Sequence, residues 1–92
     1  MKIMATWSVR PGCAKEAVSR FMAGKGGPAE GTKLLGRWHN TDWSGGFALI
    51  ESDNPSSLYE GSVAWADVLE FHGHTVVEDA EAGAVLAKLF GK

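Results

Sequence analysis

Arg37 and His39 are the side chains in this sequence whose types and spacing best suit chemistry on a small molecule. They alternate with Gly36 and Trp38 in the stretch GRWH, so both project from one face if this stretch is an extended strand. A guanidinium binds a carboxylate or an enolate through paired hydrogen bonds, and an imidazole about 7 Å away can donate or accept a proton near neutral pH. The pair therefore predicts an anion site, with Arg37 and His39 as candidate catalytic residues.

Trp7 and Glu51 complete the predicted ligand-binding set. Trp7 lies near the end of an apolar run, where its ring either packs in the core or forms the wall of a cavity. Glu51 follows another apolar run, and its carboxylate can orient Arg37 or His39 only if the strand register places it on their face. The alternative interpretation is structural, because an edge strand that points Arg37 and His39 into solvent is protected from pairing with another chain.

His72 and His74 form a second group of possible functional residues. They flank Gly73, so two imidazoles share one face of a strand at a spacing that metal sites use. In the strand order predicted below, His39 lies roughly 14 Å away within one chain, and only the His39 of a second copy can complete a three-histidine site. We therefore expect two hydrogen-bonded or solvated histidines, and neither a bound metal nor a cofactor.

The composition restricts the class of protein. The 92 residues suit one domain, and nine basic and eleven acidic residues are interspersed, which leaves no basic stripe for a nucleic acid. No run approaches the roughly 18 apolar residues of a membrane span, and the N-terminal apolar stretch is too short and too polar for a signal peptide. Cys13 stands alone, so a disulfide within the chain is impossible, and we interpret it as a half-buried structural thiol. We expect a cytoplasmic protein that binds neither nucleic acid nor a membrane.

The apolar spacing predicts alternating strands and helices. The expected elements are a strand over 2–8, a helix over 13–23, strands over 33–40 and 46–52 joined by a five-residue hairpin loop, a helix that begins at Asn54–Pro55, a strand over 71–78 and a last helix capped by Asp79. The residues expected on the buried faces of the three helices are Ala14, Ala17, Val18, Phe21 and Met22; Leu58, Trp65, Ala66 and Leu69; and Ala82, Val85, Leu86, Leu89 and Phe90.

This order is the β-α-β-β-α-β pattern of an α+β ferredoxin-like domain with an extra C-terminal helix. Right-handed crossovers then give one antiparallel sheet with the strand order 4-1-3-2 and both long helices on one face. The strands carry apolar residues at both parities, for example Met4 beside Ile3 and Leu35 beside Leu34, whereas a strand with one solvated face alternates. The second face of the sheet measures roughly 400 Å², as large as the biggest apolar patch that an ordinary monomer leaves in water. We therefore expect a homodimer in which an identical chain covers this face.

The stretches MKIMATWS, GGPAEGTKLLGRWH, GFALIES and VVEDAEAGAVLAKL together resemble a family of short bacterial proteins catalogued as domain of unknown function 3303. The resemblance covers nearly the whole chain, and GRWH is its most specific part. This family is similar to the dimeric α/β-barrel superfamily, whose members include cofactor-independent monooxygenases, isomerases, haem enzymes and stress-response proteins. The resemblance implies the fold and a dimer in which two sheets face one another. It implies no activity, because one scaffold hosts unrelated chemistries.

Two functions from different classes follow from these observations. The first is the binding of a small anionic or aromatic molecule between sheet and helices or between subunits, with cofactor-independent oxidoreductase or isomerase activity left open. The second is a non-catalytic structural or interaction module that uses its sheet face only for dimerisation. An enclosed pocket lined by Arg37 or His39 favours the first, and a dry, filled interface favours the second.

Overall fold

The computed structural model describes residues 1–91 and contains the predicted alternation of strands and helices. Its elements are β1 (Lys2–Val9), α1 (Ala14–Arg20), the π-helix η1 (Phe21–Lys25), β2 (Lys33–His39), β3 (Gly45–Glu51), α2 (Pro55–Trp65), β4 (Leu69–Val76) and α3 (Asp79–Phe90). All neighbouring strands are antiparallel, and their order in the sheet is β2-β3-β1-β4. The α+β class and the predicted strand order are therefore confirmed, in a ferredoxin-like arrangement.

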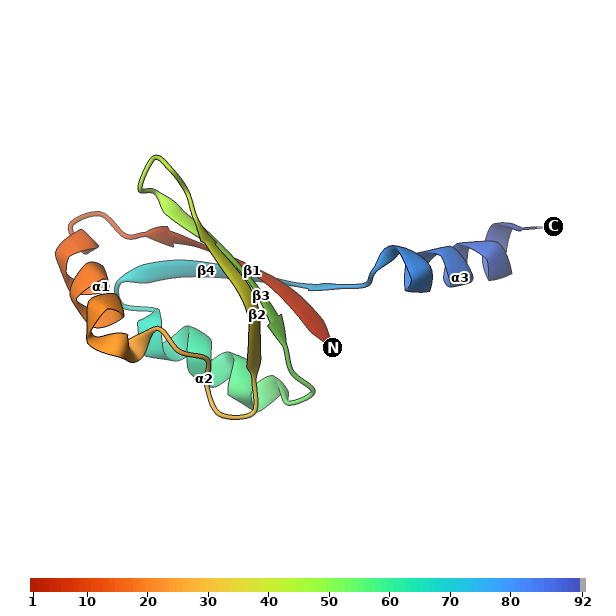
Figure 1. Cartoon of the computed structure of the whole chain (residues 1–92), viewed down its shortest axis with the longest axis horizontal. Coiled ribbons are helices and arrows are strands. Elements are labelled where there is room, and N and C mark those ends of the chain that lie inside the picture. Colours follow the sequence, from red (N-terminus) through yellow and green to blue (C-terminus); the bar gives the residue numbers. More distant parts are fainter. Residues whose placement is uncertain (92) are drawn as a thin grey trace.

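The two faces of the sheet differ in what covers them. Figure 1 shows α1, η1 and α2 on one side of the sheet, which we call the inner face. No helix of residues 1–91 covers the opposite side, the outer face, because α3 continues past the end of β4 and projects away from the sheet (Figure 1). The molecule is consequently elongated, with extents of 55 × 29 × 18 Å.

The strand register decides which side chains share the inner face. One row across the sheet consists of His39, Gly46, Trp7 and Phe71, and the neighbouring row consists of Arg37, Ala48, Ala5 and Gly73. A β-bulge between Leu34 and Gly36 adds Leu35 to β2 without a partner on β3. Leu34 and Arg37 are three positions apart, which in a regular strand would place them on opposite faces. The extra residue in the bulge instead places both on the same face.

The buried core occupies only part of the space above the inner face. Its contiguous cluster consists of Ala17, Val68 and Leu69, and the partly buried side chains packed against it are Trp7, Val9, Cys13, Trp65 and Phe71. Ile3, Ala5 and Ala48 of the sheet are also buried. No side chain of residues 1–91 is less than 2% exposed. The half-buried state expected for the Cys13 thiol agrees with its place beside this core.

The start of α2 forms as its sequence predicts, whereas its end does not. Asn54 caps the helix, since its side-chain oxygen accepts a hydrogen bond from the backbone N–H of Ser56 at 3.0 Å. The expected buried stripe runs too far, because α2 ends at Trp65 and a turn leads directly into β4. Ala66 in that turn is exposed, while Leu69 is buried as the first residue of β4.

The first helix changes its geometry halfway. The chain continues beyond α1 as the wider π-helix η1 and leaves helical geometry at Gly24, whose φ is 81°. A π turn rotates the following residues off the α-helical stripe, and Met22 is 76% exposed instead of buried as expected. Val18 and Phe21 of the same expected stripe are also exposed, at 43% and 41%. Arg20 ties this segment to the turn before β4, because its Nη1 donates to the Asp67 carboxylate at 2.9 Å and thereby lowers the pKa of Asp67.

The last helix departs most from expectation. Its N-cap is Glu78 rather than Asp79, and no side-chain capping hydrogen bond forms. The residues predicted to form its buried stripe do not pack on the domain in one chain, and Leu89 and Phe90 are 66% and 77% exposed. No helix within residues 1–91 is long and apolar enough to span a membrane.

Candidate functional site

A cavity of about 800 Å³ lies between the inner face and the covering segments α1, η1 and α2. Its floor includes the row of small residues beside Arg37, in which Ala48, Ala5 and Gly73 follow one another across three strands. Large side chains at one end of the sheet keep the helices apart from it, and the small residues of this row do not fill the space between the sheet and the helices, so a hollow remains. Small-molecule sites commonly measure about 300–1,000 Å³.

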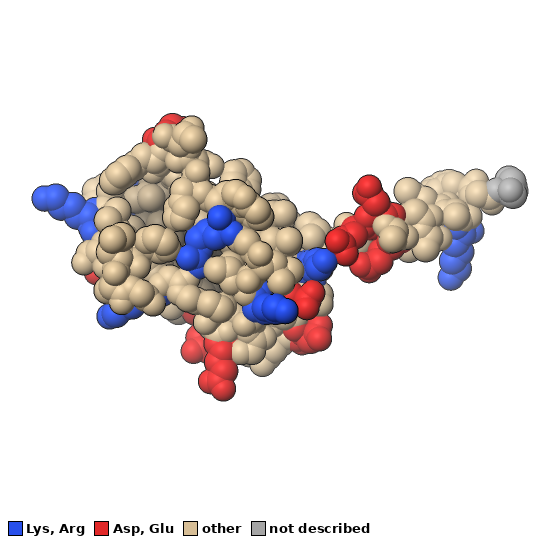
Figure 2. Space-filling model, in the orientation of Figure 1, with Lys and Arg blue, Asp and Glu red and all other residues tan. Residues whose placement is uncertain are grey.

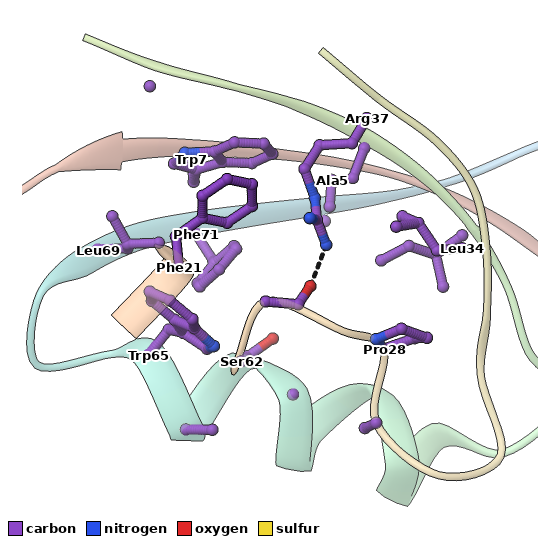
Figure 3. Close-up of a pocket in the computed structure, with 18 of the residues that line it drawn as sticks. Ala5, Trp7, Phe21, Pro28, Leu34, Arg37, Ser62, Trp65, Leu69 and Phe71 are labelled. Carbon is purple, nitrogen blue, oxygen red and sulfur yellow. Dashed lines mark hydrogen bonds between the residues drawn. The ribbon is translucent and has the colours of Figure 1, made fainter. Parts of the chain in front are cut away.

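Arg37 brings charge into this cavity. Its side chain extends from β2 between an aromatic side, which includes Trp7 and Phe71, and an aliphatic side with Leu34 and Pro28 (Figure 3). One Nη atom of Arg37 donates a hydrogen bond to the carbonyl oxygen of Gly26, in the loop that follows η1. A guanidinium has five N–H donors, so most of them remain free for a ligand.

The guanidinium of Arg37 also lies over a ring. Its central carbon is 5.5 Å from the centroid of Phe21, within the range of a cation–π contact. None of the ion pairs formed by residues 1–91 involves Arg37. Lys25 of η1 and Glu60 of α2 also line the cavity. Two positive charges and one negative charge therefore border it, and this excess of positive charge suits an anion.

His39 lies at the rim of the cavity between two aromatic rings. Its ring centroid is 5.8 Å from that of Trp7 and 5.3 Å from that of Phe21, with edge-to-face geometry in both pairs. Gly46 separates His39 from Trp7 in the same row of the sheet. A Cβ on Gly46 would stand 2.6 Å from the Trp7 ring, so the missing side chain lets this ring extend toward His39.

The structure brings three of the four predicted ligand-binding residues together and separates the fourth. Trp7, Arg37 and His39 line the cavity, whereas Glu51 pairs with Lys2 and Lys33 on the outer face. The register therefore gives Glu51 the opposite parity, and its carboxylate does not orient Arg37 or His39. Arg37 is half-buried and His39 is exposed, so the interpretation of the pair as a solvent-facing guard of the sheet edge fits His39 better than Arg37 and stays a prediction.

Several residues that line the cavity were not predicted from the sequence to belong to the site. Phe21 was expected on a buried helical stripe, yet it contacts both Arg37 and His39. Lys25 and the Gly26 carbonyl lie in the glycine-rich segment that follows the helix expected over 13–23, which was expected to be only a connecting loop. A signal was present in the glycine-rich loop itself, since backbone that closely approaches a ligand or a neighbouring side chain favours glycine.

The histidine pair lies on β4, where His72 borders the cavity but both side chains belong to the face opposite Arg37. His74 pairs with Met4 and His72 with Thr6, which places both imidazoles on the outer face as the alternation predicts. Glu70 approaches His72 at 3.9 Å. Within residues 1–91, no three histidine, cysteine or acidic side chains are placed to hold a metal ion together.

Comparison of the sequence with known proteins identifies the family of this chain. No curated protein and no solved structure matches the chain. Residues 1–90 match the family described as Domain of unknown function (DUF3303). The match spans nearly all of the 92 residues and includes the strands that carry Trp7, Arg37 and His39. The chain therefore belongs to the DUF3303 family.

Proposed function

We propose that this protein binds a small molecule with an anionic group and an aromatic or apolar body in the cavity, and that it does so as a homodimer. The observation that carries the proposal is the charge of Arg37, which reaches into an otherwise mostly apolar cavity with most of its donors unused. A partly desolvated cation that forms no ion pair is unfavourable, and a ligand carboxylate or enolate would offset that cost through two charge-assisted hydrogen bonds.

The walls of the cavity support the aromatic part of the proposal. Trp7 and Phe71 are 6.5 Å apart between centroids and tilted by 51°, so they present ring faces and edges to the same space. A flat ligand ring can lie against them while its anionic group meets Arg37, since aromatic pairs favour offset or edge-to-face contact. The aliphatic side around Leu34 and Pro28 then covers the remainder of an apolar body.

The same geometry supports proton-transfer chemistry. His39 stands beside Trp7 at the rim, near enough to the cavity for its imidazole to remove a proton from a ligand held by Arg37. Arg37 would stabilise the enolate that forms when a C–H next to a carbonyl loses its proton. Return of this proton from His39 to a different atom of the enolate would complete an isomerisation, which requires no cofactor, whereas a cofactor-independent oxidation also requires a co-substrate that accepts electrons.

The alternative function is assembly without catalysis, and the outer face favours it. Trp38 is 57% and Phe47 is 44% exposed there, on adjacent strands of one chain. A face of this kind is covered when two copies pack sheet against sheet. Dimerisation and ligand binding are compatible, because the cavity opens on the other side of the sheet.

A thermal-shift screen of small carboxylates, phenols and quinones, followed by calorimetry on the hits, tests the proposal. We expect Arg37→Gln to weaken binding of an anionic hit by about 10- to 100-fold, since a charge-assisted hydrogen bond contributes roughly 1.5–3 kcal/mol. Ala48→Leu, which extends a side chain into the cavity, should abolish binding while the protein stays folded.

Lys15→Gln is the matched control, because it removes one positive charge from an exposed position on α1 away from the cavity lining. An anionic hit whose affinity is the same in wild type, Arg37→Gln and Ala48→Leu would place binding elsewhere. A screen without hits, together with a stable dimer, would favour the assembly function.

A further inference from the structure

The apolar surface of α3 has no cover in one chain. Val85 and Leu86 are 55% and 54% exposed, and Leu89 and Phe90 are more exposed still. Between residues 82 and 90 the only charged side chain is Lys88, so most of the circumference of the helix is apolar or small. A helix of 12 residues is marginal in water unless it packs on something, and an all-round apolar helix is normally buried.

The outer face of the sheet is a second uncovered apolar surface. Trp38 and Phe47 are paired across β2 and β3, and Leu49 and Met4 are paired beside them. The six-membered ring of Trp38 lies over Gly36, where a Cβ would stand 2.6 Å from it, so the ring is directed along β2. The outer face therefore offers a broad, shallow surface suited to the side of a helix.

The α3 helix of one chain is not positioned to cover its own outer face. β4 and β2 are opposite edges of the sheet, and α3 leaves from the β4 edge whereas Trp38 lies on β2. Only Val77 and Glu78 connect β4 to α3, and Glu78 forms an ion pair with Lys2 at 3.0 Å. This short, anchored connection directs α3 away from the sheet (Figure 1).

We propose that α3 is an exchanged arm that packs against the outer face of a second copy of this chain, so that each copy of the dimer receives the α3 of the other. This inference rests on the homodimer proposed above and specifies how that dimer is held together. The lengths agree, because 12 helical residues extend about 18 Å and a strand of seven residues extends about 23 Å.

The buried area also favours the exchange. A sheet face of roughly 400 Å² per subunit falls short of the ~800 Å² per partner of a standard stable interface. The four large apolar side chains of α3 add about 250–500 Å² when covered, which brings each subunit close to that size. A dimer that used only the sheet would leave these side chains in water.

The charges of α3 argue against a lipid surface as its partner. Glu78, Asp79 and Glu81 gather at the start of the helix, and Lys88 is the basic residue near its end (Figure 2). Helices that bind membrane surfaces carry a basic polar face that meets anionic lipids, and α3 lacks one. A protein surface without strong charge, such as the centre of the outer face, is the better match.

Sedimentation velocity over a concentration series, on the full chain, tests the proposal. We expect the double variant Leu86→Glu and Leu89→Glu to weaken the dimer at least 100-fold, because both carboxylates would enter the interface of each arm. The matched control, Ala80→Glu and Ala84→Glu, adds the same two charges on the opposite side of α3 and should leave the dimer intact. Hydrogen exchange measured on residues 79–91 should show protection that is lost when wild type is diluted below its dissociation constant.

The outcomes distinguish this proposal from the dimer on which it rests. A wild-type dimer that persists in the double variant, with α3 amides unprotected, would overturn the exchange and leave a dimer formed by the sheets alone. A monomeric wild type would overturn both. Binding of that monomer to phosphatidylglycerol vesicles, lost in the double variant, would assign α3 to a membrane surface instead.

Discussion

The contact between Trp7 and the backbone at Gly46 offers a direct test of how the cavity wall is built. In Gly46→Ala the new Cβ would stand 2.6 Å from Cζ2 and 2.8 Å from Cη2 of Trp7, and closer still to the Trp38 carbonyl oxygen. This carbonyl belongs to the edge strand β2, so the new Cβ must displace both the Trp7 ring and the pairing of β2 with β3. Such overpacking typically costs about 1–3 kcal/mol.

For a domain of this size, a loss of about 2 kcal/mol lowers the melting temperature by roughly 8–16 °C. Urea unfolding followed by tryptophan fluorescence measures the loss, and near-ultraviolet circular dichroism reports whether the Trp7 environment changes. Gly73→Ala is the matched control, since its Cβ would also face the cavity but would meet Ile3 at an ordinary 3.6 Å. The reasoning is refuted if Gly46→Ala is as stable as Gly73→Ala at the same protein concentration.

Two further predictions concern the elements that support the cavity. Asn54→Ala removes the cap of α2 and should lower the free energy of unfolding by about 1 kcal/mol, or the melting temperature by roughly 4–8 °C. The control Ser56→Ala keeps the backbone N–H that donates the capping hydrogen bond to Asn54, so its stability should change little. Asp67→Asn should be less stable than wild type near neutral pH, and the difference should shrink below about pH 4. The ion pair with Arg20 lowers the pKa of Asp67, so its stabilisation is present above the unfolded-state pKa and disappears as the folded carboxylate is protonated. Thermal melts of both proteins across the acid range measure this, and a difference that stays constant down to pH 2 would contradict the role given to the pair.

The fold was predictable because its signals are local. Alternating apolar residues, the five-residue connection between β2 and β3, and the Asn54–Pro55 start of α2 each specify one element through nearest-neighbour chemistry. The ends of helices were less predictable. α2 stops at Trp65 because the turn after it joins Arg10 by a backbone hydrogen bond of 2.9 Å from Arg10 to Val68, a contact between residues far apart in sequence.

The candidate site was predictable only within one strand. Arg37 and His39 share a face because they are two positions apart, and side chains two positions apart lie on the same face of any extended strand. Whether Glu51 joins them depends on the register between β2 and β3 and on the bulge at Leu35, and a shift of one residue reverses the face of a side chain. Phe21 reaches both groups from another layer, so no spacing along the sequence could reveal it.

The strands have apolar residues on both faces of the sheet, but these residues differ in size between the two faces, and the alternation in the sequence does not show this difference. On the outer face they are large, as Trp38 and Phe47 show, and a surface of large exposed side chains favours a partner. On the inner face the central row beside Arg37 is small, with Ala48 and Ala5 buried against a hollow. Size, not polarity, separates a face that binds a chain from a face that leaves room for a ligand.

The hollow and the modest core have one physical origin, and it links stability to binding. Small residues in the central row leave the cavity unfilled, so this 92-residue domain buries less apolar surface than its length allows. A ligand present at 100 times its dissociation constant would add about 2.7 kcal/mol, comparable to the burial of one large side chain. Filling the cavity by mutation would supply similar stability without a ligand. Small residues at Ala48 and Ala5 beside Arg37 therefore agree with the ligand binding proposed above, because a bound ligand would supply the stability that the unfilled cavity lacks.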